Sequence, residues 1–70
     1  MTLEEKTRIV DASSIKGILI RVGGKTLRGN IRGLARDFPV AVVPFKDEIV
    51  RYEISWDLAR RAVDEGVVIL

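Results

Sequence analysis

Apolar and polar residues alternate along two runs of the chain that meet at a pair of glycines. One run covers residues 17–22 and the other begins at Lys25, with Gly23 and Gly24 between them. Two adjacent glycines suit a two-residue β-turn, because both central positions of that turn need a positive φ. The turn places Val22 opposite Lys25 and sends successive side chains to opposite faces. The pattern therefore predicts a β-hairpin with one apolar and one polar face.

This register sorts the hairpin side chains by polarity. The inward face is predicted to hold Ile18, Ile20, Leu27 and Ile31, together with Gly29 and Gly33. The outward face is predicted to hold Arg21, Thr26, Arg28, Asn30 and Arg32, with Leu19 as its only apolar residue. Glycines inside a strand often mark the bends of small barrels. We therefore expect the second strand to coil strongly.

Two more strands are predicted after the hairpin. Residues 38–43 are apolar on both faces and predict a buried strand. Pro39 should lie at its start and Pro44 at its end, where no ladder donor is required. Residues 49–54 alternate again and predict a fourth strand, with Tyr52 inward and Arg51 outward.

Helix signals lie near both ends of the chain. Residues 55–65 carry Ser55 as an N-cap and are followed by Gly66, a typical C-terminal stop, so a helix is predicted there. Thr2 and Glu5 have the spacing of a capping box. Residues 8–12 suit a strand equally well, so residues 1–14 are predicted as either a helix or a strand.

The last four residues, Val67, Val68, Ile69 and Leu70, form a short apolar strand. Because the run has no polar alternation, both of its faces favour burial. It is either a strand within its own sheet or an edge strand that forms an oligomer interface with another subunit.

Together these elements predict a mainly β protein, α+β by residue count. We expect one small domain over residues 1–70, an antiparallel barrel of four to five strands with a helix at 55–65 and a short final strand. Residues 20–25 (IRVGGK), 27–31 (LRGNI) and 37–43 resemble the first motif of the Sm-like proteins, which are SH3-like barrels. Phe38-Pro39-Val40 stands where that family has a Met-Asn pair. The resemblance implies a five-stranded barrel.

Composition bears on chemistry and cellular setting. The chain has neither cysteine nor histidine, which removes disulfides, thiolate chemistry and the usual zinc ligands. The carboxylates fit turn and helix-surface positions, so we expect no catalytic residues, no metal site and no cofactor. Apolar runs are far shorter than the ~20 residues that span a bilayer, and the N-terminus is acidic rather than signal-like. A cytoplasmic protein without membrane contact is expected, and its abundant charges are typical of thermophilic proteins.

Charge is distributed unevenly. Residues 16–36 hold six of the twelve basic residues and no acidic residue, so the remainder of the chain carries a net charge of −4. This asymmetry favours an anionic partner. We expect a nucleic-acid-binding face that contacts the RNA or DNA backbone with weak sequence specificity, through Arg21, Lys25, Arg28, Asn30, Arg32 and Arg36. The alternative is a non-catalytic protein-interaction or structural module, a homo-oligomer joined through strand edges; a small-ligand regulatory domain is a third option.

Overall fold

The glycine pair forms the predicted two-residue turn in a computed structural model, which describes residues 1–33 and 37–70. Strands β1 (Ile18–Val22) and β2 (Lys25–Gly33) pair antiparallel, with Val22 opposite Lys25. Gly23 and Gly24 have φ values of 56° and 77°. These are the positive angles that a tight hairpin turn requires. The predicted hairpin and its register are confirmed.

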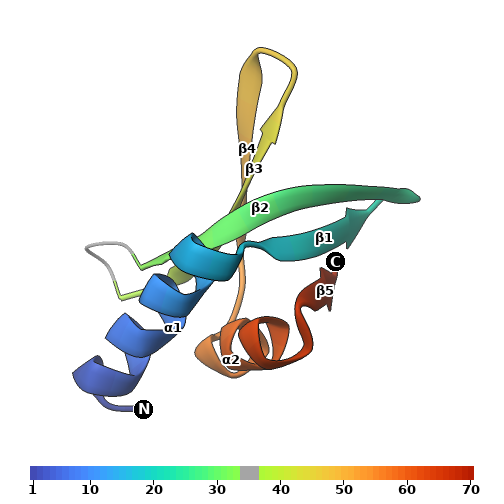
Figure 1. Cartoon of the computed structure of the whole chain (residues 1–70). Coiled ribbons are helices and arrows are strands. Elements are labelled where there is room, and N and C mark those ends of the chain that lie inside the picture. The colour runs from blue at the N-terminus through green and yellow to red at the C-terminus, as the bar shows by residue number, and fades with distance from the viewer. Residues whose placement is uncertain (34–36) are drawn as a thin grey trace.

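Five strands form one sheet in the order β4-β3-β2-β1-β5 (Figure 1). The remaining strands are β3 (Pro39–Phe45), β4 (Glu48–Glu53) and β5 (Val67–Ile69). Pro39 is the first residue of β3 and is buried, as is most of that strand. In β4 Tyr52 is half-buried and Arg51 exposed, so the predicted alternation is also confirmed.

Strand β2 changes its partner halfway along its length. Its first part pairs with β1 up to Gly29, and from Asn30 onward it pairs with β3, where Asn30 faces Val42. A Cβ added at Gly29 would overlap the Val42 carbonyl oxygen and would lie 2.8 Å from Cδ1 of Ile20. Glycine is therefore needed where the two strand pairs meet, and β2 is curved along its length (Figure 1).

Two helices accompany the sheet, α1 (Leu3–Lys16) and α2 (Trp56–Glu65). The Thr2 hydroxyl accepts a hydrogen bond from the Glu5 backbone N–H at 3.1 Å, and the Glu5 carboxylate accepts one from the Thr2 N–H at 3.4 Å. This capping box settles the choice between helix and strand at the N-terminus. α2 begins after Ser55 and ends at Gly66, as predicted. Neither helix is long and apolar enough to cross a membrane, in the part of the chain that the structure describes.

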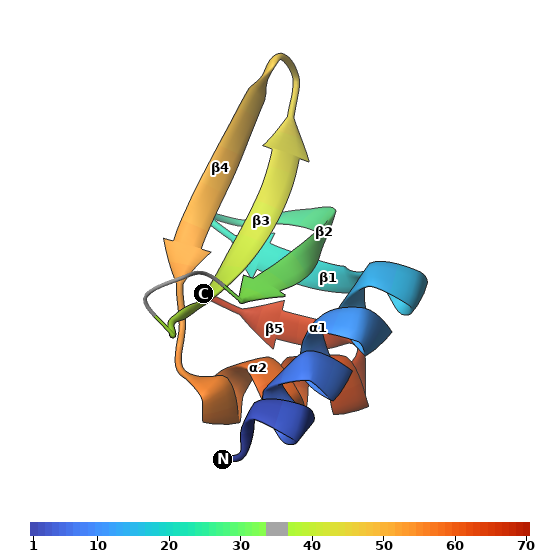
Figure 2. The ribbon, with the colours of Figure 1, turned by 90° about the vertical axis from the view of Figure 1, so that its left-hand side faces the viewer.

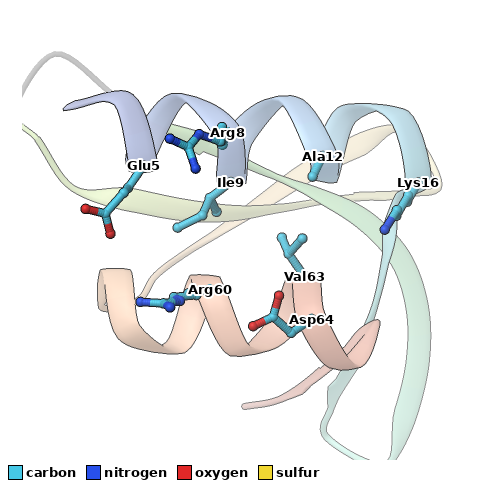
Figure 3. Close-up of a pocket in the computed structure, with 8 residues that line it drawn as sticks. All are labelled: Glu5, Arg8, Ile9, Ala12, Lys16, Arg60, Val63 and Asp64. Atoms are coloured by element: carbon cyan, nitrogen blue, oxygen red, sulfur yellow. The ribbon is translucent and has the colours of Figure 1, made fainter. Parts of the chain in front are cut away.

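The last strand differs from the predicted antiparallel arrangement, because β5 pairs parallel to β1. β1 follows directly after α1, and β5 follows directly after α2. The two helices lie side by side and run in the same direction (Figure 3). Both strands therefore start from the same end of the molecule and run the same way. The all-antiparallel prediction is wrong at this edge.

The chain thus has an α+β fold with a five-stranded sheet and two helices (Figure 2). The core joins inward residues of the sheet to both helices: Ile18, Ile20, Ile31, Ala41, Val43, Val68, Ile9, Ala59 and Ala62. β4 and β5 lie at opposite ends of the strand order, and no pairing joins them within residues 1–33 and 37–70. The sheet is therefore open, and the closed barrel expected from the sequence is not confirmed.

Candidate nucleic-acid interface

The outer face of the sheet, opposite the buried core, brings arginines from two separate strands together. Two cross-strand rows cover it, Asn30–Val42–Arg51 and Arg32–Val40–Glu53. Directly opposed side chains in a sheet have their Cβ atoms about 5 Å apart. Arg32 of β2 and Arg51 of β4 consequently stand on either side of β3, in neighbouring rows.

A shallow depression lies between these two arginines, and we call it the β3 hollow. It has a volume of about 270 Å³ and is lined by Arg32, Val40, Val42, Ile49 and Arg51. Its accessible apolar surface comes from Val42, which is half-buried, and from Ile49, which is 57% exposed; Val40 lies beneath them at only 4% exposure. The hollow thus combines an aliphatic floor with a guanidinium group on each side.

A second depression, the α1 hollow, lies where the C-terminal end of α1 meets β2. Its volume is about 440 Å³, and its lining is Ser14, Ile15, Lys16, Gly17, Arg28, Gly29, Asn30 and Pro44. The Arg28 Nη1 atom donates to the Lys16 carbonyl oxygen at 3.4 Å. This contact holds Arg28 against the helix end and leaves most of its five N–H donors available to an external acceptor.

Asn30, the one polar uncharged residue predicted in the site, serves the fold instead. With its amide oriented to satisfy both polar atoms, the nitrogen donates to the Ser13 carbonyl oxygen at 2.8 Å. The Ser13 hydroxyl in turn accepts from the backbone N–H of Ile31 and is fully buried. Both contacts attach α1 to the part of β2 that lies beyond the end of β1. Asn30 therefore lines the α1 hollow mainly as a structural residue.

The charge of the outer face is nearly all of one sign. Lys16, Arg28, Arg32 and Arg51 line the two hollows. Glu53 lies beside them in the row of Arg32. The ion pairs found among the described residues, Lys6–Asp37 and Arg8–Glu4, both involve bases of α1 that line neither hollow. The outer-face cations are thus not neutralised by either pair.

The other predicted basic residues lie elsewhere. Arg21 is exposed on the outward side of β1, opposite Thr26 and next to Ile69 of β5, and it lines neither hollow. Lys25 alternates with Thr26 and points toward the core side, where its Nζ lies 4.7 Å from the centre of the Phe45 ring. Arg36 falls outside the described residues. The structure therefore keeps Arg28 and Arg32 on the same face of β2, each in a different hollow, and places Lys25 on the other face.

Two cations of the outer face were not predicted as site residues. Arg51 was expected to point outward, but its position next to Arg32 depends on two successive registers, β2 with β3 and β3 with β4. Lys16 belongs to the basic segment of the sequence, and only the fold of residues 1–16 as a helix brings its backbone carbonyl to Arg28; its ammonium group points toward the groove between the helices (Figure 3). The alternation of β4 was the signal that pointed to Arg51.

The predicted interface residues at the C-terminus are divided by their burial. Val68 is only 3% exposed and packs in the core, and Val67 is half-buried. Ile69 and Leu70 are 70% and 38% exposed. β5 pairs with β1 of its own chain, and within the described part of the chain its other edge has no strand beside it. The pairing within the chain is therefore observed, and one edge is left open.

A third depression lies between the two helices (Figure 3). It measures about 430 Å³ and is lined by Glu5, Arg8, Ile9, Ala12, Lys16, Arg60, Val63 and Asp64. Ile9 and Val63 point toward each other across it, while acidic and basic side chains alternate around the rim. Because both signs of charge are mixed, this groove favours neither anionic nor cationic ligands.

Neither a metal centre nor a phosphate-binding loop emerges from the geometry. Residues 1–33 and 37–70 contain no group of three or more residues able to ligate a metal ion. The Gly23-Gly24-Lys25-Thr26 sequence forms a hairpin turn followed by a strand. A P-loop would instead place the start of a helix there.

Comparison with protein-family models, curated proteins and solved structures finds no match for this chain. The functional argument therefore depends on the geometry and charge of the two hollows.

Proposed function

We propose that the protein is a small nucleic-acid-binding module that contacts the phosphate backbone through the outer face, with weak sequence specificity. The observation that carries the proposal is the pairing register, which sets Arg32 and Arg51 on either side of β3. Guanidinium groups bind phosphate oxygens through paired N–H donors. The lining of the α1 hollow adds Arg28 to the same side of β2, with Lys16 at the end of the neighbouring helix.

Weak specificity follows from the kind of side chains present. Contacts to phosphates position a protein but carry no sequence information. Asn30, the side chain suited to base-edge recognition, is engaged with α1. The binding energy is then dominated by ion pairs and should depend strongly on salt concentration. Four cations that neutralise four phosphates give a log–log salt slope of about −3 on single strands and about −4 on duplex.

The salt dependence of nucleic-acid binding, compared between two variants of equal net charge, tests this function. The triple substitution Arg28→Ala/Arg32→Ala/Arg51→Ala should weaken binding to labelled oligonucleotides and reduce the salt slope by about 2. The control, Arg8→Ala/Arg60→Ala/Arg61→Ala, removes the same charge from exposed positions of the helices. Fluorescence anisotropy across a salt series measures both. Equal affinities and slopes for the two variants would refute the proposal.

A second candidate function is self-association through strand edges, and the open edge of β5 favours it. The exposed Ile69 lies on this edge, at 70% exposure. β4 occupies the other end of the sheet. Unpaired edges of this kind template pairing with another chain. Light scattering should then report an oligomer at high micromolar concentration that Ile69→Lys dissociates; a monomeric wild-type protein would contradict this candidate.

We also propose that the sheet is an open relative of the SH3-like barrel implied by the Sm-like resemblance, acting in the cytoplasm. Support for the fold comes from β2, which is curved and pairs with β1 up to Gly29 and with β3 beyond it. A strand shared in this way is how small barrels turn a corner.

A further inference from the structure

We propose that the β3 hollow seats one unpaired nucleobase, so that the outer face selects single-stranded nucleic acid over duplex. This inference rests on the proposed function and names its substrate class. It starts from a feature that phosphate binding alone leaves unexplained, the aliphatic floor between Arg32 and Arg51.

The floor is chemically unsuited to a phosphate. Val42 is half-buried and Ile49 is 57% exposed, so both offer apolar surface to a ligand. An anion placed against these groups would lose hydration and gain no hydrogen bond. The face of a nucleobase is planar and largely apolar, and covering aliphatic surface with it removes both surfaces from water. Arginine side chains also stack on exposed bases.

The spacing of the two arginines suits one base with its neighbouring phosphates. Arg32 and Arg51 lie on strands separated by β3 and in rows two residues apart, so their backbones are about 12 Å apart. A base lying over Val42 would have Arg51 directly on one side and Arg32 diagonally on the other, in the row of Val40. Each guanidinium then reaches a phosphate that flanks the base, while the α1 hollow with Arg28 continues the basic surface beyond β2.

Duplex nucleic acid makes poor use of this surface. Stacking hides the faces of its bases, and only their edges are accessible in the grooves. A two-stranded ribbon can enter a major groove, and the β3–β4 hairpin projects from the body of the protein (Figure 2). Its tip carries the exposed acids Asp47 and Glu48 and one exposed base, Lys46, so its net charge is negative. The phosphates that line the groove would repel these acids, which disfavours binding of the hairpin to duplex. Because only a single strand exposes the faces of its bases, the aliphatic floor favours a single strand.

The test compares three labelled probes of about 12 nucleotides, a length within the site sizes of small single-strand-binding domains. They are an oligothymidine strand, an abasic strand with the same sugar–phosphate backbone, and a duplex of equal length. Wild-type protein should bind the oligothymidine about tenfold more tightly than the abasic strand. Ile49→Ala should lower affinity for the oligothymidine about fivefold and leave affinity for the abasic strand unchanged. Leu3→Ala, a control 79% exposed on α1, should change neither.

Each other outcome overturns a defined proposal. Equal affinity for the base-containing and abasic strands, an equal effect of Ile49→Ala on both, or preference for the duplex would reject the nucleobase site and leave backbone binding intact. Failure of wild-type protein to bind any probe would reject the proposed function as well. The hollow could instead be covered by a second copy of the chain, and sedimentation of the free protein tests this. An oligomer that Ile49→Ala dissociates would place a second copy over the hollow and reject the nucleobase site.

Discussion

Replacing Gly29 by alanine should destabilise the protein more than the same change at Gly33, although both glycines lie on the core side of β2. At Gly29 the added Cβ overlaps the backbone carbonyl of Val42 and comes within 2.8 Å of Ile20. At Gly33 the nearest atom, 3.3 Å away, belongs to the side chain of Trp56. A side chain can rotate away, whereas a carbonyl in a paired strand moves only with its strand.

The expected loss in free energy of unfolding follows from the atoms that the new methyl group must displace. Inserting a methyl group into a closely packed site costs about 1–3 kcal/mol. If β3 shifts to make room, the Asn30–Val42 pairing is strained, and the loss of one ladder hydrogen bond costs about 1 kcal/mol more. Alanine also restricts the unfolded chain, which stabilises by about 0.4–1 kcal/mol. The net loss for Gly29→Ala is about 2–3 kcal/mol, against less than about 1 kcal/mol for Gly33→Ala.

Urea denaturation monitored by circular dichroism measures the free energy of unfolding of both variants, and thermal melts measure their melting temperatures. In a chain of this length, a loss of 2–3 kcal/mol should lower the melting temperature by about 10–20 °C. An effect of Gly29→Ala below about 0.5 kcal/mol, or one smaller than that of Gly33→Ala, would show that β2 does not cross β3 at Gly29. The partner switch that defines the sheet would then be wrong.

Three further outcomes are expected. Ser13→Ala should cost about 1–3 kcal/mol in urea denaturation, because a buried backbone N–H of β2 loses its acceptor; a neutral effect would contradict this contact. Hydrogen bonds from the Thr2 backbone and then its hydroxyl lower the pKa of Glu5 below its ordinary 4.5, so its stabilising contribution is complete above that pH and is lost as the pH falls through the lowered pKa. Thr2→Ala should raise this pKa part of the way back in an NMR titration, and an unchanged value would exclude the hydroxyl contribution. Val68→Ala should cost about 1–2 kcal/mol and Ile69→Ala less than about 0.5 kcal/mol in thermal melts, and the reverse order would mean that β5 presents its other face to the core.

The hairpin and α2 were predictable because residues within each element determine its turn or its ends. Two adjacent glycines fix a tight turn, and once the turn is fixed, alternation assigns every side chain of β1 and β2 to a face. Ser55 and Gly66 mark both ends of α2 within the sequence itself. Such signals depend on neighbouring residues only, so they can be recognised in the sequence without knowledge of the tertiary structure.

The direction of β5 and the full composition of the outer face depend on contacts between distant segments. β5 runs parallel to β1 because α1 and α2 pack side by side in the same direction, and the sequence left open whether α1 was a helix at all. Lys25 was assigned to the site by its charge, although its alternation with Thr26 places it on the other face; the Phe45 ring that it contacts there comes from twenty residues further on. Arg51 reaches the neighbourhood of Arg32 only through β3. Propensity and alternation contain no information of this kind.

The two candidate functions use perpendicular directions of the same sheet, so they do not exclude each other. Side chains such as Arg32 and Arg51 project from the face, whereas strand edges offer backbone groups within the plane of the sheet. Copies joined at β4 or β5 would leave the outer face open and would align several such faces side by side. A strand of nucleic acid bound to one face would then meet the next at high effective concentration. A weak site of about four cations therefore gains most from assembly, because each added copy contributes its own phosphate contacts without requiring a larger domain.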